Sequence, residues 1–261
     1  MTTAASYIVN LAARGRHHFT TVEAAAALGC TVPGVRAALR RLKAKGAVAD
    51  PFRGFWVIVP PEYRRLGCLP AEQFVPQLMQ HLGDPYYATL LSAAEIHGAA
   101  HQRPQAFQVM LKTNRRAIEH GEVRVQFIAR KDMEGTSVVE KKTPRGLLRV
   151  ASPEATALEL VGYADQSGGL DNVASVLTEL VDAIDPDRLV TERERSPIAW
   201  VQRFGNILDL TEHRKLADKI APVVVARAKD VAPLVRSITR AGAPRDVRWK
   251  LAVNATVEPD L

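Results

Sequence analysis

The sequence has few cysteine and aromatic residues, and it has no long apolar run. Its two cysteines, Cys30 and Cys68, lie far apart and show no metal-ligand spacing, so we expect reduced thiols in a cytoplasmic protein. Aromatic residues make up 6% of the chain, too few for a stacking platform on single-stranded nucleic acid. No segment approaches the ~18 apolar residues of a membrane span. The first residues also lack the basic and apolar regions of a secretion signal, so we expect no membrane partner.

Acidic residues are scarce in the first quarter of the chain. The chain has 35 basic and 28 acidic residues, and residues 1–66 contain ten of the basic and three of the acidic ones. Residues 67–261 therefore contain 25 of each kind. The whole net charge of +7 therefore belongs to residues 1–66. Such a concentration favours a polyanionic partner, and double-stranded DNA is the first candidate. The alternative is a basic surface that only contacts solvent.

Residues 1–66 have the pattern of three helices followed by a β-hairpin. The first helix is expected over 4–13, and Thr20 with Glu23 forms a capping box that starts the second. Thr31 caps the third helix, where Pro33 costs little because it stands in the first turn. Strands over 47–49 and 55–59 enclose a turn at 50–54. This order predicts a winged helix-turn-helix domain.

The third helix combines a buried stripe with a basic face. Its apolar residues recur at helical spacing, and Arg36 and Arg40 stand on another face. A helix of this kind fits the major groove, where arginine bridges base edges and other bases hold phosphates. We expect Arg36 and Arg40 to contact bases or phosphates. The full set of expected DNA-binding residues is Thr31, Pro33, Gly34, Arg36, Ala37, Arg40, Arg41, Lys43, Lys45 and Arg53.

Residues 70–261 are expected to form a second, larger domain after a linker at 62–72. Apolar runs predict strands over 107–111, 123–128 and 147–150, and a final strand over 247–254. The polar stretch at 140–142 is expected to be a loop. Helices are expected over 72–82, 85–97, 153–163, 171–183, 186–193, 197–208 and 213–228. The fold class is therefore α+β: a winged-helix domain (1–66) and a small sheet flanked by helices (70–261).

No pattern in the chain calls for catalysis. His97 and His101 have a spacing of four, but the zinc-binding glutamate motif is missing, so a structural role is favoured. Asp132, Glu140 and Lys142 follow the residue order of restriction-type nucleases, which would predict Mg²⁺-dependent nicking. A nuclease site of this kind requires Glu140 and Lys142 to lie on a strand beside Asp132. We expect no enzyme, no catalytic residues, no metal and no cofactor.

Three segments carry a family resemblance. The runs YYATLLSAAEIHGAAHQRPQAFQVM (86–110), GGLDNVASVLTEL (168–180) and WKLAVNATVEPDL (249–261) resemble AbiEi-type antitoxins of type IV toxin–antitoxin systems. The resemblance implies an N-terminal winged helix that binds inverted repeats in its own promoter and represses it. It also implies a C-terminal domain that antagonises a nucleotidyltransferase toxin. By resemblance, DNA contact carries over only to Arg36, Arg40, Arg41, Lys43 and Arg53.

A second interpretation stays open beside the antitoxin. The chain would then be a stand-alone winged-helix repressor whose second domain senses a ligand or dimerises. A toxin gene next to this one would favour the antitoxin, and a deep apolar pocket in residues 70–261 would favour the sensor.

Overall fold

The computed structural model describes residues 3–99 and 104–259, which form two compact units built from discontinuous segments. The first unit comprises Met1–Tyr87, Gln105–Lys131 and Glu140–Arg149, and the second comprises Ala88–Pro104, Asp132–Val139 and Val150–Leu261.

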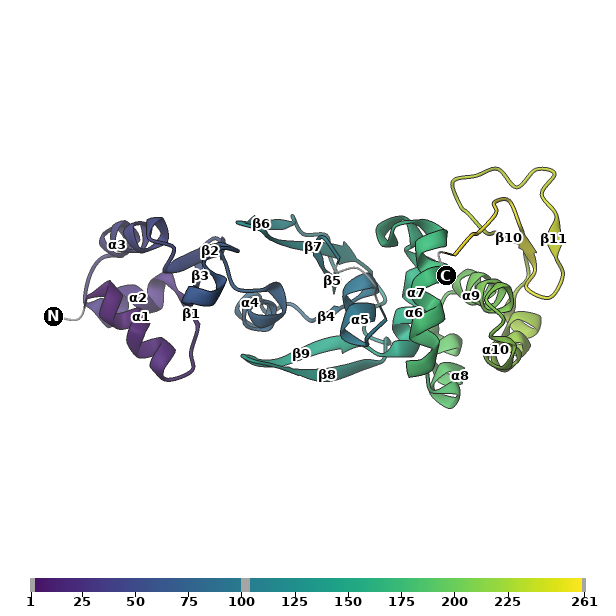
Figure 1. Ribbon diagram of the computed structural model, residues 1–261, viewed down its shortest axis with the longest axis horizontal. Coiled ribbons are helices and arrows are strands. Elements are labelled where there is room, and N and C mark those ends of the chain that lie inside the picture. The colour runs from purple at the N-terminus through teal and green to yellow at the C-terminus, as the bar shows by residue number, and fades with distance from the viewer. Residues whose placement is uncertain (1–2, 100–103, 260–261) are drawn as a thin grey trace. The chain divides into compact units, whose positions relative to one another are not determined.

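The N-terminal part of the first unit has three helices and a three-stranded antiparallel sheet (Figure 1). The strand order is β1-β3-β2, with β3 in the centre. This agrees with the predicted winged-helix arrangement. Its elements are α1 (Ala4–Ala13), β1 (His18–Thr20), α2 (Thr21–Leu28), α3 (Val32–Ala44), β2 (Val48–Phe52) and β3 (Phe55–Ile58).

Local sequence signals place the helix boundaries as expected. The Thr20 hydroxyl accepts from the amide of Glu23, and the Glu23 carboxylate accepts from the amide of Thr20, so the capping box is confirmed. Gly29 ends α2 in the left-handed region at φ 60°. The Thr31 hydroxyl accepts from the amide of Gly34 and caps α3. Together these caps fix the short turn that orients α3.

The three-stranded sheet differs from the prediction in two ways. The turn contains only Arg53 and Gly54, because β2 extends through Pro51 to Phe52. Proline is tolerated there since β2 is an edge strand. The short strand β1 was not predicted, because three residues give no periodicity, yet its Phe19 is fully buried.

A second sheet of six strands lies mainly in the first unit. Its order is β6-β7-β5-β4-β9-β8, with β5 and β7 parallel and β6 antiparallel to β7. The helix α4 (Val75–Leu82) precedes it in the chain. The strands are β4 (Tyr86–Ala88), β5 (Phe107–Leu111), β6 (Ile118–His120), β7 (Val123–Ala129), β8 (Val138–Thr143) and β9 (Gly146–Ala151).

Three expectations for this region are wrong. Residues 86–88 are a strand rather than the start of a helix, which begins only at Leu90. Residues 140–142 belong to β8, a polar edge strand that lacks the apolar alternation used for prediction. The segment expected as a linker includes Cys68 and Leu69, which are 0% and 1% exposed and therefore belong to a core.

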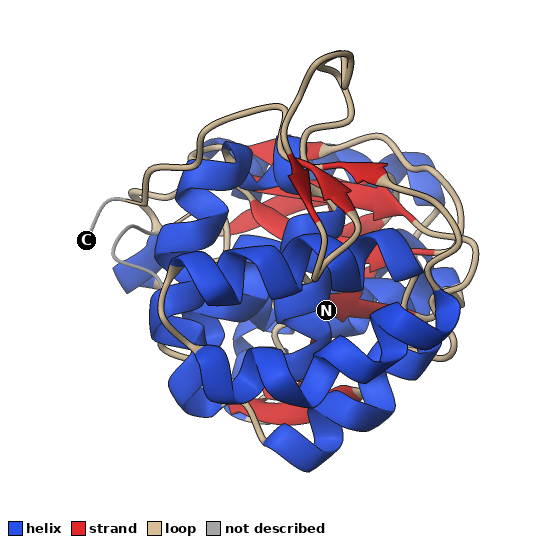
Figure 2. Cartoon of the chain, turned by 90° about the vertical axis from the view of Figure 1, so that its right-hand side faces the viewer, coloured by secondary structure: helices blue, strands red, loops and turns tan. Residues whose placement is uncertain are grey.

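The second unit consists of packed helices with short strands at its C-terminal end (Figure 2). Among the described residues no single helix of the chain is long and apolar enough to cross a membrane, whereas α2 and α3 reach that length only as a pair bent by 106°. The predicted α+β class is confirmed. The elements are α5 (Leu90–Ile96), α6 (Pro153–Gly162), α7 (Gly169–Leu180), α8 (Pro186–Arg195), α9 (Ile198–Leu210), α10 (Arg214–Arg227), β10 (Ala232–Pro233), β11 (Arg245–Asp246) and β12 (Leu251–Ala252).

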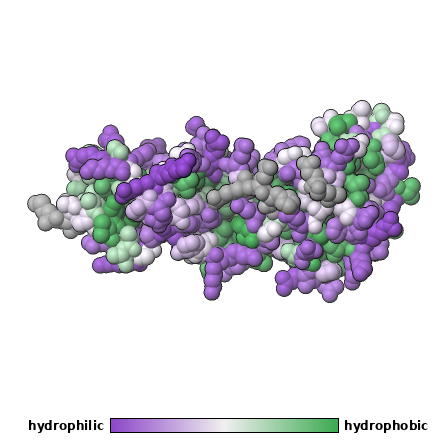
Figure 3. Space-filling view, in the orientation of Figure 1, coloured by the Kyte–Doolittle hydropathy of each residue, from purple (hydrophilic) through white to green (hydrophobic). Residues whose placement is uncertain are grey.

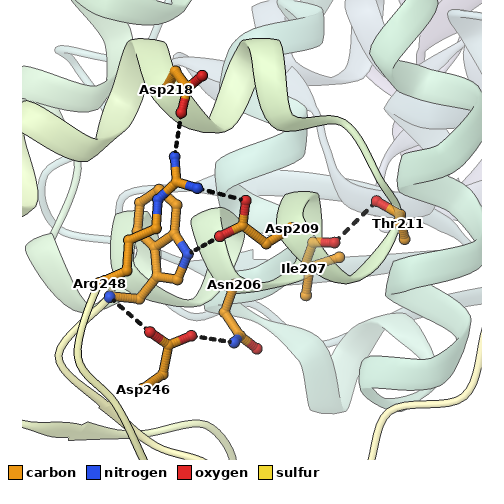
Figure 4. A network of polar contacts seen from close by, with 8 residues as sticks. Asn206, Ile207, Asp209, Thr211, Asp218, Asp246 and Arg248 are labelled. Atoms are coloured by element: carbon orange, nitrogen blue, oxygen red, sulfur yellow. Dashed lines mark hydrogen bonds and ion pairs between the residues drawn. The ribbon is translucent and has the colours of Figure 1, made fainter.

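Arg248 and Trp249 anchor the C-terminal segment to α9 and α10, and Figure 4 shows Arg248 directed toward Asp209 and Asp218. Trp249 is fully buried, and its indole nitrogen donates to the Asp209 carboxylate over 2.7 Å. The Arg248 guanidinium lies 4.9 Å from the Trp249 ring and bridges Asp209 at 3.0 Å and Asp218 at 2.5 Å. Gly205 of α9 makes room for the ring. The expected final strand is therefore mostly irregular chain fixed by side-chain contacts.

Candidate nucleic-acid interface

The helix α3 has one buried and one exposed face. Val35 and Leu39 are 0% exposed and pack in the core with Phe19 and Trp56. Val32 and Leu42 are half-buried against the same core, so the predicted apolar stripe is confirmed. The rest of the helix surface is left to solvent. Figure 3 shows hydrophilic residues gathered where Figure 1 places α3.

Every residue expected to contact DNA is exposed to solvent. The exposed set comprises Thr31, Pro33, Gly34, Arg36, Ala37, Arg40, Arg41, Lys43, Lys45 and Arg53. Exposure is a necessary condition for contact with a duplex. These residues lie on α3, at its two ends and in the turn of the hairpin that follows it. Their role in DNA binding stays a prediction.

Five of the six exposed bases have no ion pair within residues 3–99 and 104–259: Arg36, Arg40, Arg41, Lys45 and Arg53. The side chain of Arg40 donates from Nε to the carbonyl oxygen of Arg36 over 3.4 Å, and this leaves its terminal nitrogens directed elsewhere. Unpaired guanidinium groups retain their full charge for phosphates or base edges. The basic face of α3 is therefore available to an anionic partner.

Lys43 differs from the other bases because it is already paired. Its ammonium lies 2.5 Å from a carboxylate oxygen of Asp50 on β2. The same oxygen lies 3.2 Å from Nε2 of His120 on β6. Sequence reasoning missed this cluster, since His120 follows Asp50 by 70 residues and no local pattern joins them. A phosphate contact by Lys43 would have to compete with Asp50.

The wing hairpin is attached on two sides. At its turn, the carbonyl oxygen of Gly54 accepts from the amide of Thr21 over 2.9 Å. On β2, the Arg115 guanidinium lies 5.7 Å from the centre of the Phe52 ring, a cation–π contact. Because β2 also packs against β6, the hairpin is held rigidly while Arg53 stays exposed at its tip.

Glu23 strengthens the cap of α2 through its charge. Burial alone would raise the pKa of this carboxyl, but hydrogen bonds from the Arg16 side chain and from Thr20 outweigh it and hold the pKa below its ordinary value. The carboxylate accepts from Arg16 as well as from the Thr20 amide. The ionised form is therefore favoured, and with it the helix start that precedes α3.

The side chains considered for catalysis are arranged as follows. His97 has its Nε2 atom 2.7 Å from the carbonyl oxygen of Ala151, and His101 lies outside the described residues. Glu140 and Lys142 stand on strand β8, as the nuclease interpretation would require. In the part of the chain that the structure describes, no three His, Cys, Asp or Glu side chains form a group able to hold a metal ion.

Comparisons with known proteins give one family match and a similar solved structure. Residues 87–210 match the family described as the AbiEi antitoxin C-terminal domain. No curated protein matches the sequence. Among solved structures, the crystal structure of the RV2827C protein from Mycobacterium tuberculosis is similar, with a TM-score of 0.66 and 17% identity. The similarity covers 95% of this chain and 90% of that chain, and at this identity it supports the fold alone.

Proposed function

Because residues 87–210 belong to the AbiEi antitoxin C-terminal domain family, we propose that this chain is the antitoxin of a type IV toxin–antitoxin system. In this proposal its second domain antagonises a nucleotidyltransferase toxin. Its winged helix binds inverted repeats of double-stranded DNA in its own promoter and represses transcription. The protein acts in the cytoplasm and is not an enzyme.

The observation that carries the DNA part of the proposal is the exposed basic face of α3. Arg36 and Arg41 have no ion pair within residues 3–99 and 104–259, and both stand on a helix whose opposite face is buried. A rigid helix with free guanidinium groups on one side suits the major groove. The family of residues 87–210 supports the antitoxin part independently.

The antitoxin part is tested by co-expression with the adjacent gene. We expect that gene alone to arrest growth of the host and this chain to relieve the arrest. A chain with Arg36→Ala and Arg40→Ala serves as a matched variant, since it should lose promoter binding and still relieve toxicity. If the neighbour is toxic and the intact chain gives no relief, the antitoxin proposal is wrong.

The repressor part is tested separately with a promoter–reporter fusion. The intact chain should lower reporter output, and the Arg36→Ala, Arg40→Ala chain should restore it. As control, Arg149→Ala removes an exposed base from β9 and should leave repression unchanged. Equal repression by all three chains would contradict the assignment of α3.

A surface groove supports the second interpretation, in which the chain is a stand-alone winged-helix repressor whose second domain senses a ligand. The groove has a volume of about 790 Å³ and is lined in part by Leu210, Leu234 and Ile238. Leu210 and Ile238 are 49% and 44% exposed, so apolar surface is accessible there. A harmless neighbouring gene together with intact repression would favour this alternative.

A further inference from the structure

A cationic cavity lies within the first unit, apart from the exposed face of α3. Its volume is about 190 Å³, room for roughly six waters at about 30 Å³ each. It is formed by the loop between α1 and β1, by α4 with the segment before it, and by the turn between β8 and β9. Its lining residues are Arg14, Gly15, Arg16, His17, His18, Leu69, Gln73, Phe74, Gln77 and Arg145, with no carboxylate among them.

The turn between β8 and β9 holds Arg145 against this cavity. The Nε atom of Arg145 donates to the side-chain oxygen of Gln73 over 2.8 Å, and the Arg145 carbonyl oxygen accepts from Gln77 over 2.9 Å. Gln73 is 5% exposed and donates in turn to the Tyr63 hydroxyl at 3.0 Å. The guanidinium is thus oriented by buried groups, and its two terminal nitrogens have no partner among the described side chains.

Two polar atoms of the lining are buried without a hydrogen-bond partner in the described part of the chain. They are Nδ1 of His17 and the side-chain oxygen Oε1 of Gln77. Buried polar atoms are rarely left unpaired, because each costs the full desolvation of the group. The Gln77 oxygen can only accept, and Nδ1 of His17 donates in the tautomer that carries its proton on that nitrogen. A ligand for this cavity therefore needs both an acceptor and a hydroxyl donor.

We propose that this cavity binds the phosphate group of a phosphate monoester or of inorganic phosphate. Arg14 and Arg145 supply positive charge, and His17 donates from Nδ1 to a phosphate oxygen. The P–OH group of the monohydrogen form donates to Gln77. Arg16 is not assigned to the ligand, because it is paired with Glu23.

The same argument separates two sources of phosphate. A phosphodiester of the DNA backbone carries no P–OH group, so it would leave the Gln77 oxygen unpaired. A monoester or free phosphate satisfies both orphaned atoms. The inference goes beyond DNA binding and toxin neutralisation, and it stands whether or not those proposals hold.

The first test titrates the full chain with inorganic phosphate at constant ionic strength, with chloride as the balancing anion. Phosphate should raise the Tm saturably, since it binds the folded state. Arg14→Gln removes one charge from an exposed side chain that has no hydrogen bond or ion pair with the described residues, and it should weaken phosphate binding about tenfold or more. Arg65→Gln removes the same charge outside the cavity and should bind as the intact chain does.

A second measurement follows the His17 imidazole by NMR. Burial, and the nearby Arg145, lower the pKa of His17, while Glu62 raises it; Arg14, Arg16 and His18 are its other charged or titratable neighbours. Bound phosphate should raise the His17 pKa, and Arg145→Gln should abolish that response. An absent Tm response, or equal responses in Arg14→Gln and Arg65→Gln, overturns the site.

The source of the phosphate is resolved by DNA binding in phosphate-free buffer. We expect Arg14→Gln and Arg65→Gln to bind duplex DNA equally. If Arg14→Gln selectively weakens DNA binding and leaves phosphate binding intact, the cavity takes a backbone phosphate and the monoester proposal is wrong.

Discussion

Arg40 is the residue at which the DNA proposal is most sharply tested. It is exposed on α3 one turn after Arg36, and its Nε bond to the Arg36 carbonyl oxygen restricts where its terminal nitrogens point. If it bridges a guanine, Arg40→Ala should weaken operator binding by about 1–3 kcal/mol. Fluorescence anisotropy with a labelled operator measures the change. Arg149→Ala is the control, and an unchanged affinity in Arg40→Ala removes this residue from the interface.

Gly205 is a residue whose lack of a side chain is structural. A Cβ there would lie 2.1 Å from the Trp249 ring, and the ring cannot move because Trp249 is fully buried and bonded to Asp209. We expect Gly205→Ala to lower the free energy of unfolding by about 1–3 kcal/mol, as overpacked cores do. Denaturant midpoints measure this. Gly135→Ala, where no atom lies within 4 Å, should cost much less than Gly205→Ala.

Glu23 gives a pH dependence with a defined sign. Its folded pKa lies below the ordinary value of 4.5, so its stabilisation is fully present above pH 4.5 and is lost as pH falls through the folded pKa. Glu23→Gln should therefore cost about 0.2–1 kcal/mol at neutral pH, and nothing at a pH below the folded value. Urea melts at several pH values check this. A constant difference across the acid range would contradict it, and Glu62→Gln serves as the exposed control.

At the scale of elements, α3 and its hairpin are expected to act as a DNA-binding module. Residues 1–68 alone should keep weak, salt-sensitive DNA binding, with about 0.9 counterions released per phosphate contact. The fragment should be less stable than the same residues in the full chain, because it loses the Asp50–His120 contact and the bond from Glu122 to Leu66. The expected boundary between residues 66 and 70 stays a prediction. If the fragment binds DNA no better than residues 70–261, the charge argument fails.

Elements with strong local signals were predictable from the sequence. The capping box at Thr20, the cap at Thr31 and the apolar stripe of α3 fix that part of the chain within a residue or two. The strands β5 and β7 were found because they are apolar runs of ordinary length. Each of these features depends on residues close together in sequence.

Elements that depend on distant partners were missed. The strands β1 and β6 have three residues each, and they form because β3 and β7 pair with them. The polar strand β8 exists as an edge of a sheet whose other strands are apolar. The Lys43–Asp50–His120 cluster joins α3, β2 and β6, so no single segment contains its signal. The exposure of the candidate DNA-binding residues within α3, in contrast, follows from helix periodicity.

At the scale of the whole molecule, one winged helix presents one α3 to the duplex. An inverted repeat offers two equivalent half-sites, so we expect two copies of the chain to saturate it. The centres of the two half-sites should lie about 10 bp apart or at a multiple of that distance. Native mass spectrometry or calorimetry with the full repeat gives the stoichiometry. Saturation by a single copy would contradict this arrangement, and a half-site duplex that binds one copy is the control.

The carboxylate shared by Lys43 and His120 has a consequence for how this sequence can change. Asp50 neutralises a base of α3, whereas His120 lies in the segment that matches the antitoxin family. Replacing Lys43 or Asp50 leaves the other charge without its partner, either on the proposed DNA-reading helix or beside it. Substitutions at these positions are therefore tolerated best in combination. We therefore expect that a change at Lys43 on the proposed DNA-reading helix requires a matching change at Asp50, a residue that also contacts the family-matching segment through His120.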